Sequence, residues 1–190
     1  MALRVLGLIP ARGGSTRVPR KNLQDVGGMP LLARAMLHCR GAKLLTDWRV
    51  STDSVDLALA AVYLDGNVRR VLSRNKSGGD VPVILAIQEA MEDLRDAAFD
   101  AIALVQPTSP FREAKDIDEC ISLLTPSVHS VVSVDAQTGK RNGAVYVTRL
   151  DMLRDGLVFN EQSRQYSMPH ERSIDINTPE DLAEARRMAK

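Results

Sequence analysis

Apolar residues in this chain fall either in short continuous runs or in longer stretches at helical spacing. Short apolar runs bounded by turn residues are typical of strands buried in a parallel sheet. Apolar positions three or four residues apart indicate helices with one buried face. The runs predict strands at 5–9, 48–51, 68–72, 101–105, 130–134 and 144–147, and the periodic stretches predict helices at 30–39, 55–62, 82–94, 114–124 and from 179 onward.

The predicted strands and helices alternate along the sequence. This order is typical of an α/β protein, and it favours a three-layer fold with a doubly wound, mostly parallel sheet. Such sheets bind ligands in the crevice outside the carboxyl ends of their strands. We therefore expect the loops after Ile9, Leu72 and Val105 to open on one functional edge.

Length and composition are those of one compact domain. The chain has 190 residues, of which 44% are hydrophobic and 26% charged, so we interpret residues 1–190 as a single globular domain. The net charge of +1 provides no overall field for nucleic acid or an anionic membrane, and neither is expected as a partner. No apolar run approaches the roughly 20 residues that span a bilayer.

The first residues and the cysteines point to a cytoplasmic protein. Arg4 interrupts the apolar start and no basic leader precedes it, which argues against a signal peptide. Cys39 and Cys120 lie in predicted helices, and neither has a partner at metal-ligand spacing. We expect both to be buried thiols in a reducing compartment.

The loop at 10–22 is the clearest candidate for anion binding. It carries four cations and no acid, and residues 1–24 contain no carboxylate. Gly13 and Gly14 would let backbone N–H groups approach an anion, and Ser15 and Asn22 add neutral donors. The pattern favours a polyphosphate ligand, although it is not a Walker A sequence. The alternative is a flexible, solvated loop between a strand and a helix.

Five strings, in order, resemble the CMP-N-acetylneuraminate synthetase (acylneuraminate cytidylyltransferase) family. They lie at 9–23, 51–54, 106–112, 141–146 and 173–182. The resemblance implies a nucleotide-diphospho-sugar transferase-like fold. It also implies that the anomeric hydroxyl of a sialic-acid-like nonulosonic acid attacks the α-phosphate of CTP and releases pyrophosphate, with Mg²⁺ as cofactor.

The resemblance assigns the nucleotide-binding and catalytic residues. Catalysis would depend on Lys21, Arg12 and Asp175. The residues implied to bind the nucleotide are Arg12, Gly13, Gly14, Ser15, Lys21, Asn22 and Arg74, the last of them near the base. The alternative for Arg74 is a surface arginine.

Two further residues would bind the sugar acid. Gln106 would face the sugar, and Arg141 would meet its carboxylate with a fork-shaped cation. The alternatives are loop capping for Gln106 and a surface turn for Arg141.

Asp175 and Asn177 are the candidate Mg²⁺ ligands. They alternate along a stretch expected to be extended, so their side chains would point the same way and could share one cation. Family members have aspartate at both positions, which predicts a weaker metal site here. The alternative is that Asn177 helps to cap the last helix.

Two departures from the family keep other functions open. Thr16 stands where relatives have lysine, and relatives carry a longer sugar-binding and dimerisation segment near 135–141. A homodimer is therefore a weaker expectation than CTP binding. The alternatives are a catalytically degenerate nucleotide-binding or regulatory homologue, and a cytidylyltransferase for another sugar acid such as Kdo.

Overall fold

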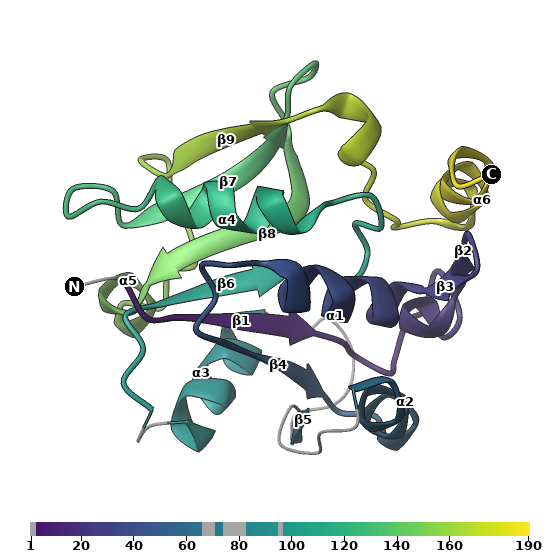
Figure 1. The fold of residues 1–190 in the computed structure, drawn as a ribbon, viewed down its shortest axis with the longest axis horizontal. Helices are drawn as coiled ribbons and strands as arrows, with labels where there is room; N and C mark the ends of the chain where they lie inside the picture. The colour runs from purple at the N-terminus through teal and green to yellow at the C-terminus, as the bar shows by residue number, and fades with distance from the viewer. Residues whose placement is uncertain (1–2, 66–70, 74–82, 95–96) are drawn as a thin grey trace.

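A seven-stranded sheet forms the centre of the protein (Figure 1). The computed structural model describes residues 3–65, 71–73, 83–94 and 97–190. The strand order is β5-β4-β1-β6-β8-β7-β9. The strands are β1 (Val5–Pro10), β4 (Asp47–Thr52), β5 (Val71–Ser73), β6 (Ala101–Val105), β7 (Ser130–Asp135), β8 (Arg141–Arg149) and β9 (Arg164–Met168).

The sheet is mostly parallel, as the sequence predicts. Strand β1 pairs in parallel with β4 and β6, β4 with β5, and β7 with β9. Strand β8 is antiparallel to both neighbours, β6 and β7. The carboxyl ends of the parallel strands and the start of β8 therefore lie along one edge.

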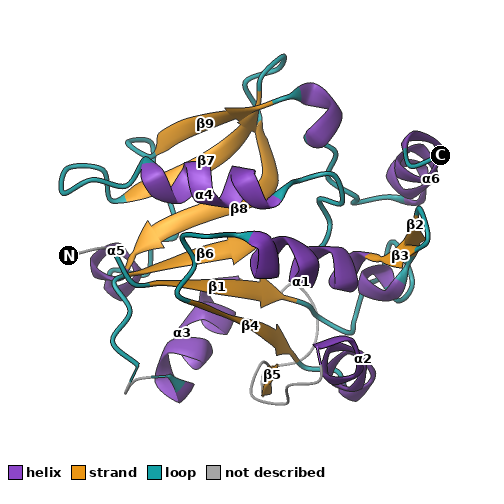
Figure 2. Cartoon of the chain, in the orientation of Figure 1, coloured by secondary structure: helices purple, strands orange, loops and turns teal. Residues whose placement is uncertain are grey.

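Helices cover both faces of the sheet, which confirms the three layers (Figure 2). The helices α1 (Leu31–Gly41), α2 (Val55–Asp65) and α4 (Ala114–Ser122) pack on one face. The helices α3 (Val83–Asp93) and α5 (Leu150–Arg154) pack on the other. Successive β6 side chains point to opposite faces, so Ala103 packs with the first group and Ile102 with the second.

The C-terminal helix α6 (Pro179–Met188) packs beside a small hairpin of β2 (Asp25–Val26) and β3 (Met29–Pro30). A separate apolar cluster joins them, in which Val18 and Val26 meet Ile176 and Leu182. Thr178 begins α6 with a capping box, and Pro179 suits its first turn. This cluster holds the 10–22 loop against the segment that precedes α6.

Most predicted elements are present, and the differences have simple causes. The apolar run at 144–147 is the centre of the longer β8, whose polar ends hide its extent. Strand β9 was not predicted, because only Tyr166 and Met168 alternate there among polar neighbours on an edge strand. Residues 68–70 of the predicted strand at 68–72 lie outside the described residues.

Both cysteines are buried and form no disulfide, as expected. Burial raises the pKa of the Cys120 thiol, so it stays protonated. In the part of the chain that the structure describes, no helix has the length and apolar character required to cross a bilayer.

Candidate active site

Two segments about 155 positions apart meet at the carboxyl edge of the sheet. The Lys21 ammonium donates to the Ile176 carbonyl at 2.9 Å. The Ile176 amide in turn donates to the Thr108 carbonyl at 2.9 Å, in the loop after β6. The structure thus brings the predicted nucleotide loop, the predicted metal segment and the 106–112 loop together.

The Lys21 ammonium is half-buried among charges of both signs. Its pKa is lowered from its ordinary value, chiefly by burial, and the nearby charges of Arg17 and Arg12 lower it further. The charges of Asp175 and Asp181 act in the opposite direction. An anion that entered beside these cations would relieve their mutual repulsion, because opposite charges stabilise each other strongly at partly buried sites.

The 10–22 loop is held by hydrogen bonds that were not predicted from the sequence. The Gly13 amide donates to Asp53 Oδ1 at 2.7 Å, and a side chain at Gly13 would stand 2.7 Å from the Ser54 Cβ. The close approach that Gly13 allows is therefore to the loop after β4. Asn22 is buried, and its amide donates to the Arg12 carbonyl at 2.9 Å. Both residues shape the loop, in addition to any contact with a nucleotide.

The turn that presents Lys21 has an unusual backbone. Arg20 adopts a left-handed conformation with φ 51° and ψ 36°, directly before the short helix η1 (Lys21–Leu23). Left-handed backbone is uncommon for residues other than glycine and often marks a functional segment. The Gln24 amide then returns to the Lys21 carbonyl at 2.9 Å, which closes the turn.

Asp175 and Asn177 lie side by side, as their alternation predicts. The Asn177 amide donates to Asp175 Oδ2 at 2.7 Å. The second oxygen, Asp175 Oδ1, is buried and accepts no hydrogen bond from the described residues. A buried carboxylate oxygen without a donor fits a cation ligand. Among the described residues, however, no group of three or more His, Cys, Asp or Glu side chains could hold a metal by itself.

Strand β8 approaches Asp175 through a β-bulge. The register of β7 and β8 shifts between Val132 and Val134. Gly143 lies in the bulge with φ 71°, and a Cβ there would be 3.2 Å from Asp175 Oδ2. The bulge requires a left-handed residue and the carboxylate leaves no room for a side chain, so both facts favour glycine.

Replacing Gly143 with alanine should therefore disturb Asp175 as well as the bulge. We expect a loss of about 1–2 kcal/mol of stability, from the left-handed backbone and the added contact, and a clear loss of activity. Gly156→Ala is the matched control, because Gly156 has φ 77° and open space around its Cβ. Thermal unfolding and turnover would be measured for both variants. Equal loss of activity in the two would contradict a role for Gly143 beside Asp175.

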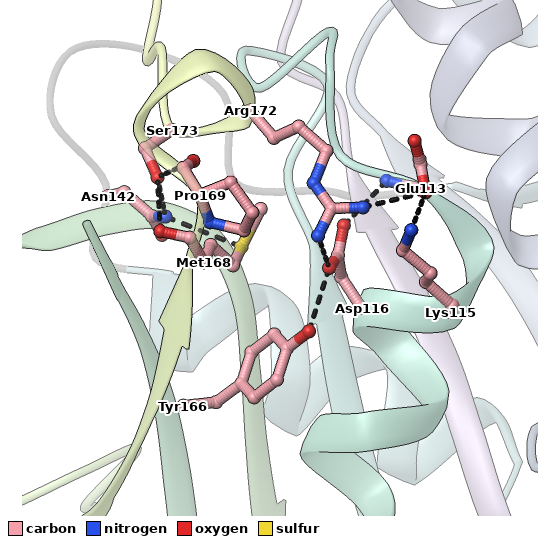
Figure 3. Close-up of polar contacts among 9 residues, drawn as sticks. All are labelled: Glu113, Lys115, Asp116, Asn142, Tyr166, Met168, Pro169, Arg172 and Ser173. Atoms are coloured by element: carbon pink, nitrogen blue, oxygen red, sulfur yellow. Dashed lines mark hydrogen bonds and ion pairs between the residues drawn. The ribbon is translucent and has the colours of Figure 1, made fainter. Parts of the chain in front are cut away.

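Asn142 ties this bulge to the segment that leads to Asp175 (Figure 3). Its carbonyl oxygen accepts from Ser133 Oγ at 2.6 Å and from the Ala144 amide at 3.2 Å. Its amide nitrogen donates to Ser173 Oγ at 3.0 Å. Because Asn142 is buried and bonded on both sides, it fixes the spacing between β8 and residue 173.

A second network in Figure 3 anchors the same segment to α4. Arg172, in the short helix η3 (His170–Arg172), contacts Asp116 at 3.0 Å and Glu113 at 2.6 Å. The Tyr166 hydroxyl donates to the same Asp116 oxygen at 2.9 Å. Burial and this hydrogen bond raise the pKa of the Tyr166 phenol, which keeps the donor protonated. The path from β9 to Asp175 is thus fixed at two points.

Arg112 fixes the loop that carries Gln106. The Arg112 guanidinium is fully buried and donates to the carbonyls of Gln106 and Ala144, each at 2.9 Å. It also contacts His38 Nδ1 at 3.2 Å. Burial lowers the pKa of His38 to about 3. His38 is therefore neutral, and its Nδ1 accepts from the arginine, which can only donate. Gln106 itself is half-buried at the end of β6.

Arg141, at the start of β8, lines an open cavity of about 700 Å³. Its guanidinium lies over the Phe159 ring, 4.3 Å from the ring centre. Only a short turn, 136–140, separates β7 from β8, as the sequence indicates. The cavity is lined by Val132, Gly139, Lys140, Arg141, Phe159, Asn160, Glu161, Ser163 and Gln165. A separate, smaller cavity opens beside Arg12, Gly13, Arg20 and Asn22.

Comparison with known proteins identifies the family. The sequence model of the family described as "Cytidylyltransferase" matches residues 6–186. This chain belongs to the cytidylyltransferase family. The match extends over all the segments that form the candidate site, from the loop after β1 to the helix α6.

Individual relatives agree with this cytidylyltransferase assignment. The CMP-N,N'-diacetyllegionaminic acid synthase of Legionella pneumophila is 28% identical, with 95% of this chain and 94% of the relative aligned. Its alignment of 218 positions exceeds the 190 residues of this chain, so the relative carries insertions. N-acylneuraminate cytidylyltransferase A of Danio rerio is 26% identical over 96% of this chain, which spans about half, 50%, of that relative.

Solved structures confirm the fold of this cytidylyltransferase. A CMP:2-keto-3-deoxy-manno-octonic acid synthetase complexed with CTP has a TM-score of 0.74 and 16% identity, covering 97% of this chain and 98% of its own. At this identity the likeness shows the fold alone. The expected nucleotide-diphospho-sugar transferase-like architecture is thus supported by topology as well as by sequence.

Sequence reasoning found some of the site of this cytidylyltransferase and missed other parts. Lys21, Asp175 and Asn177 are brought together, and Arg12 is close enough for its charge to lower the pKa of Lys21. Arg74 lies outside the described residues. The supporting roles of Asn142 and Arg112 were missed. Both stand inside strings that resemble the family, at 106–112 and 141–146, and this was the signal available in the sequence.

Proposed function

We propose that this protein transfers CMP from CTP to a sialic-acid-like nonulosonic acid. The oxygen of the acceptor's anomeric hydroxyl would bond to the α-phosphorus, the bond to the β-phosphate oxygen would break, and pyrophosphate would leave. The hydroxyl proton would pass to water. Transfers of this kind depend on positioning and on stabilising the phosphate charge.

The observation that carries the proposal is the position of Lys21. Its ammonium lies between the cationic loop and the Asp175 segment, with a pKa lowered chiefly by burial and by Arg17 and Arg12. The Lys21 ammonium would form a strong, charge-assisted hydrogen bond when a triphosphate binds. Arg12 and Ser15 belong to the same loop and would contact the phosphates, while Asn22 keeps the loop in shape.

Mg²⁺ fits this site as a cofactor held jointly by protein and nucleotide. Mg²⁺ is commonly bound by one or two carboxylates together with substrate phosphates. Asp175 would supply the buried oxygen that lacks a donor, and Asn177 would supply an amide oxygen after its side chain turned. When bound, the ion would neutralise charge that develops on the phosphates.

Asn177→Asp should strengthen this metal site. The substitution replaces an amide that donates to Asp175 with a carboxylate that repels it. We expect a lower melting temperature in chelator, a larger rise on adding Mg²⁺, and a lower Mg²⁺ concentration for half-maximal rate. Thermal unfolding and turnover across a Mg²⁺ series measure all three. An unchanged Mg²⁺ dependence would count against a shared site at these residues.

Arg141 and its neighbour Lys140 support an acidic acceptor. Both line the open cavity, which also presents the polar side chains of Asn160 and Gln165. A carboxylate would pair with the guanidinium, and hydroxyl or acylamino groups would meet the amides. Gln106, at the end of β6, would face the sugar from the nucleotide side.

Pyrophosphate release tests the proposal. Purified protein would be incubated with CTP and Mg²⁺ and with each of several acids: N-acetylneuraminic, legionaminic and pseudaminic acids and Kdo. Asp175→Ala is the control. We expect release with a nonulosonic acid and its loss in the control. Release with Kdo alone would change the acceptor, and CTP binding without release on any acid would favour a degenerate nucleotide-binding homologue.

The setting of the reaction is also part of the proposal. Two buried, reduced thiols suit a cytoplasmic protein, and CTP is expected there as a substrate. Assembly into a homodimer remains a prediction, which size-exclusion chromatography with light scattering would test.

A further inference from the structure

Phe159 lines the open cavity beside Arg141, the proposed acceptor cavity, and packs on strand β8 of the candidate site. It lies in the loop between α5 and β9 and is half-buried. Its ring packs on Tyr146 of β8 with 5.2 Å between ring centres and an angle of 58°. Its other contact is the Arg141 guanidinium, 4.3 Å from the ring centre. Phe159 lines the cavity and thus contacts both Tyr146 of β8 and the cavity's cation, Arg141.

The loop that carries Phe159 is well anchored. The Ser130 and Ser163 hydroxyls are 2.6 Å apart, and the Asn160 backbone N–H donates to Ser163 Oγ at 3.0 Å. Thr148 also donates to the Val158 carbonyl, directly before Phe159. Because β7 and β8 hold both ends of this segment, the ring has a defined place.

Tyr146 lies between Phe159 and the candidate transfer site at Asp175. It is the β8 residue that packs on Phe159, and it follows the Gly143 bulge that meets Asp175. Burial raises the pKa of its phenol, which Asp175 raises further and Arg141 lowers. Tyr146 therefore lies within electrostatic range of both the candidate metal ligand and the candidate carboxylate-binding residue.

We propose that Phe159 is a positioning residue, which holds the Arg141 guanidinium where it receives the acceptor's carboxylate. Arg141 is otherwise an exposed arginine at the start of a strand, and such a side chain samples many rotamers. A ring beneath the guanidinium restricts that sampling and leaves the planar N–H fork free for a carboxylate. The same chain supplies both the cation and its platform, beside a turn of only a few residues.

Phe159→Leu tests this inference, which rests on the proposed function. The substitution keeps an apolar side chain and removes the aromatic face. We expect the acceptor KM to rise about three- to five-fold, which is the size of an exposed cation–π contact. The KM for CTP and kcat should change little. Phe159→Tyr should restore the wild-type KM, and Tyr63→Leu, on the exposed side of α2, is the matched control.

A binding measurement separates the two proposals. The Arg141 Nε–H signal would be followed by NMR as N-acetylneuraminic acid and the other acids are added, in wild type and in Phe159→Leu. Weaker acid binding and a lost ring-current shift in the variant support the inference, even if no acid is turned over and the proposed function fails. Equal acid binding in the two proteins would overturn it. So would the absence of any perturbation of the Arg141 signal in the wild type.

Discussion

Replacing Lys21 with alanine is expected to reduce turnover by about 10²- to 10³-fold while the protein remains folded. Losing one preorganised donor to developing charge has an effect of this size, about 2.7–4 kcal/mol. Lys21 is half-buried beside Asp175 and donates to the Ile176 carbonyl, a bond that water can replace at this partly open site. Kinetics with saturating CTP and thermal unfolding measure the two effects separately.

Lys43→Ala is the matched control, because Lys43 is exposed and lies away from the site. It should leave both activity and stability unchanged. Near-normal turnover in Lys21→Ala would remove Lys21 from the mechanism. A large fall in the melting temperature of Lys21→Ala would instead show that the lysine serves mainly to hold the segment around Ile176 in place.

The pH profile gives a second signature of Lys21. In the proposed mechanism the reaction needs the charged ammonium of Lys21. Burial and neighbouring cations lower the pKa of Lys21 below its ordinary 10.5. Activity that depends on the ammonium is present below that lowered pKa and is lost as the pH rises through it. The pH dependence of kcat/KM for CTP reports groups of the free enzyme. We therefore expect kcat/KM to decrease as the pH rises, with a midpoint below pH 10.5. In Lys21→Arg this fall should move to higher pH.

Replacing Arg112 with methionine is expected to destabilise the protein by about 3 kcal/mol or more. The buried guanidinium donates to two carbonyls, at Gln106 and Ala144, and both would lose this donor. The Gln106 carbonyl would keep a longer contact with the Ser109 amide, at 3.4 Å. A buried acceptor left unsatisfied costs about 1–3 kcal/mol, and removal of a buried charge from its network adds to this. Burial lowers the pKa of Arg112 to about 10, so the native network retains its cation at neutral pH.

Chemical denaturation measures this loss, and Arg187→Met is its control. Arg187 lies exposed on α6 and pairs with Glu184, so its replacement should change stability by no more than about 0.5 kcal/mol. Arg112→Lys should be intermediate at best, since an ammonium lacks the planar fork that reaches both carbonyls. Equal stability of Arg112→Met and wild type would show that β6 and β8 are held together without this contact.

The candidate site was only partly predictable from sequence because its residues act through distant partners. The cations of the 10–22 loop and the Asp175–Asn177 alternation could be read directly, and the structure places Lys21, Asp175 and Asn177 together. Gly13 was predicted to let the backbone approach an anion, and the structure adds a hydrogen bond from its backbone amide to Asp53, forty positions away. A single sequence contains no signal for that pairing.

The sequence by itself determined the elements and their order. The spacing of apolar residues depends on which face of each element is buried. Apolar runs and helical spacing were therefore enough to predict β1, β6, α1 and α4 and the mostly parallel sheet. The edge strand β9 was not predicted, because it has little buried surface. The resemblance to the family, carried by local strings, indicated the candidate nucleotide loop and the candidate metal segment.

Only the tertiary structure decided how those segments meet. The packing of Val18 and Val26 on Ile176 and Leu182 places the first loop beside the last helix. The Gly143 bulge and Asn142 then set the approach of β8 to Asp175, and Phe159 was found beneath Arg141. These contacts join residues far apart in the chain, and their energy depends on burial and geometry that local sequence patterns do not encode.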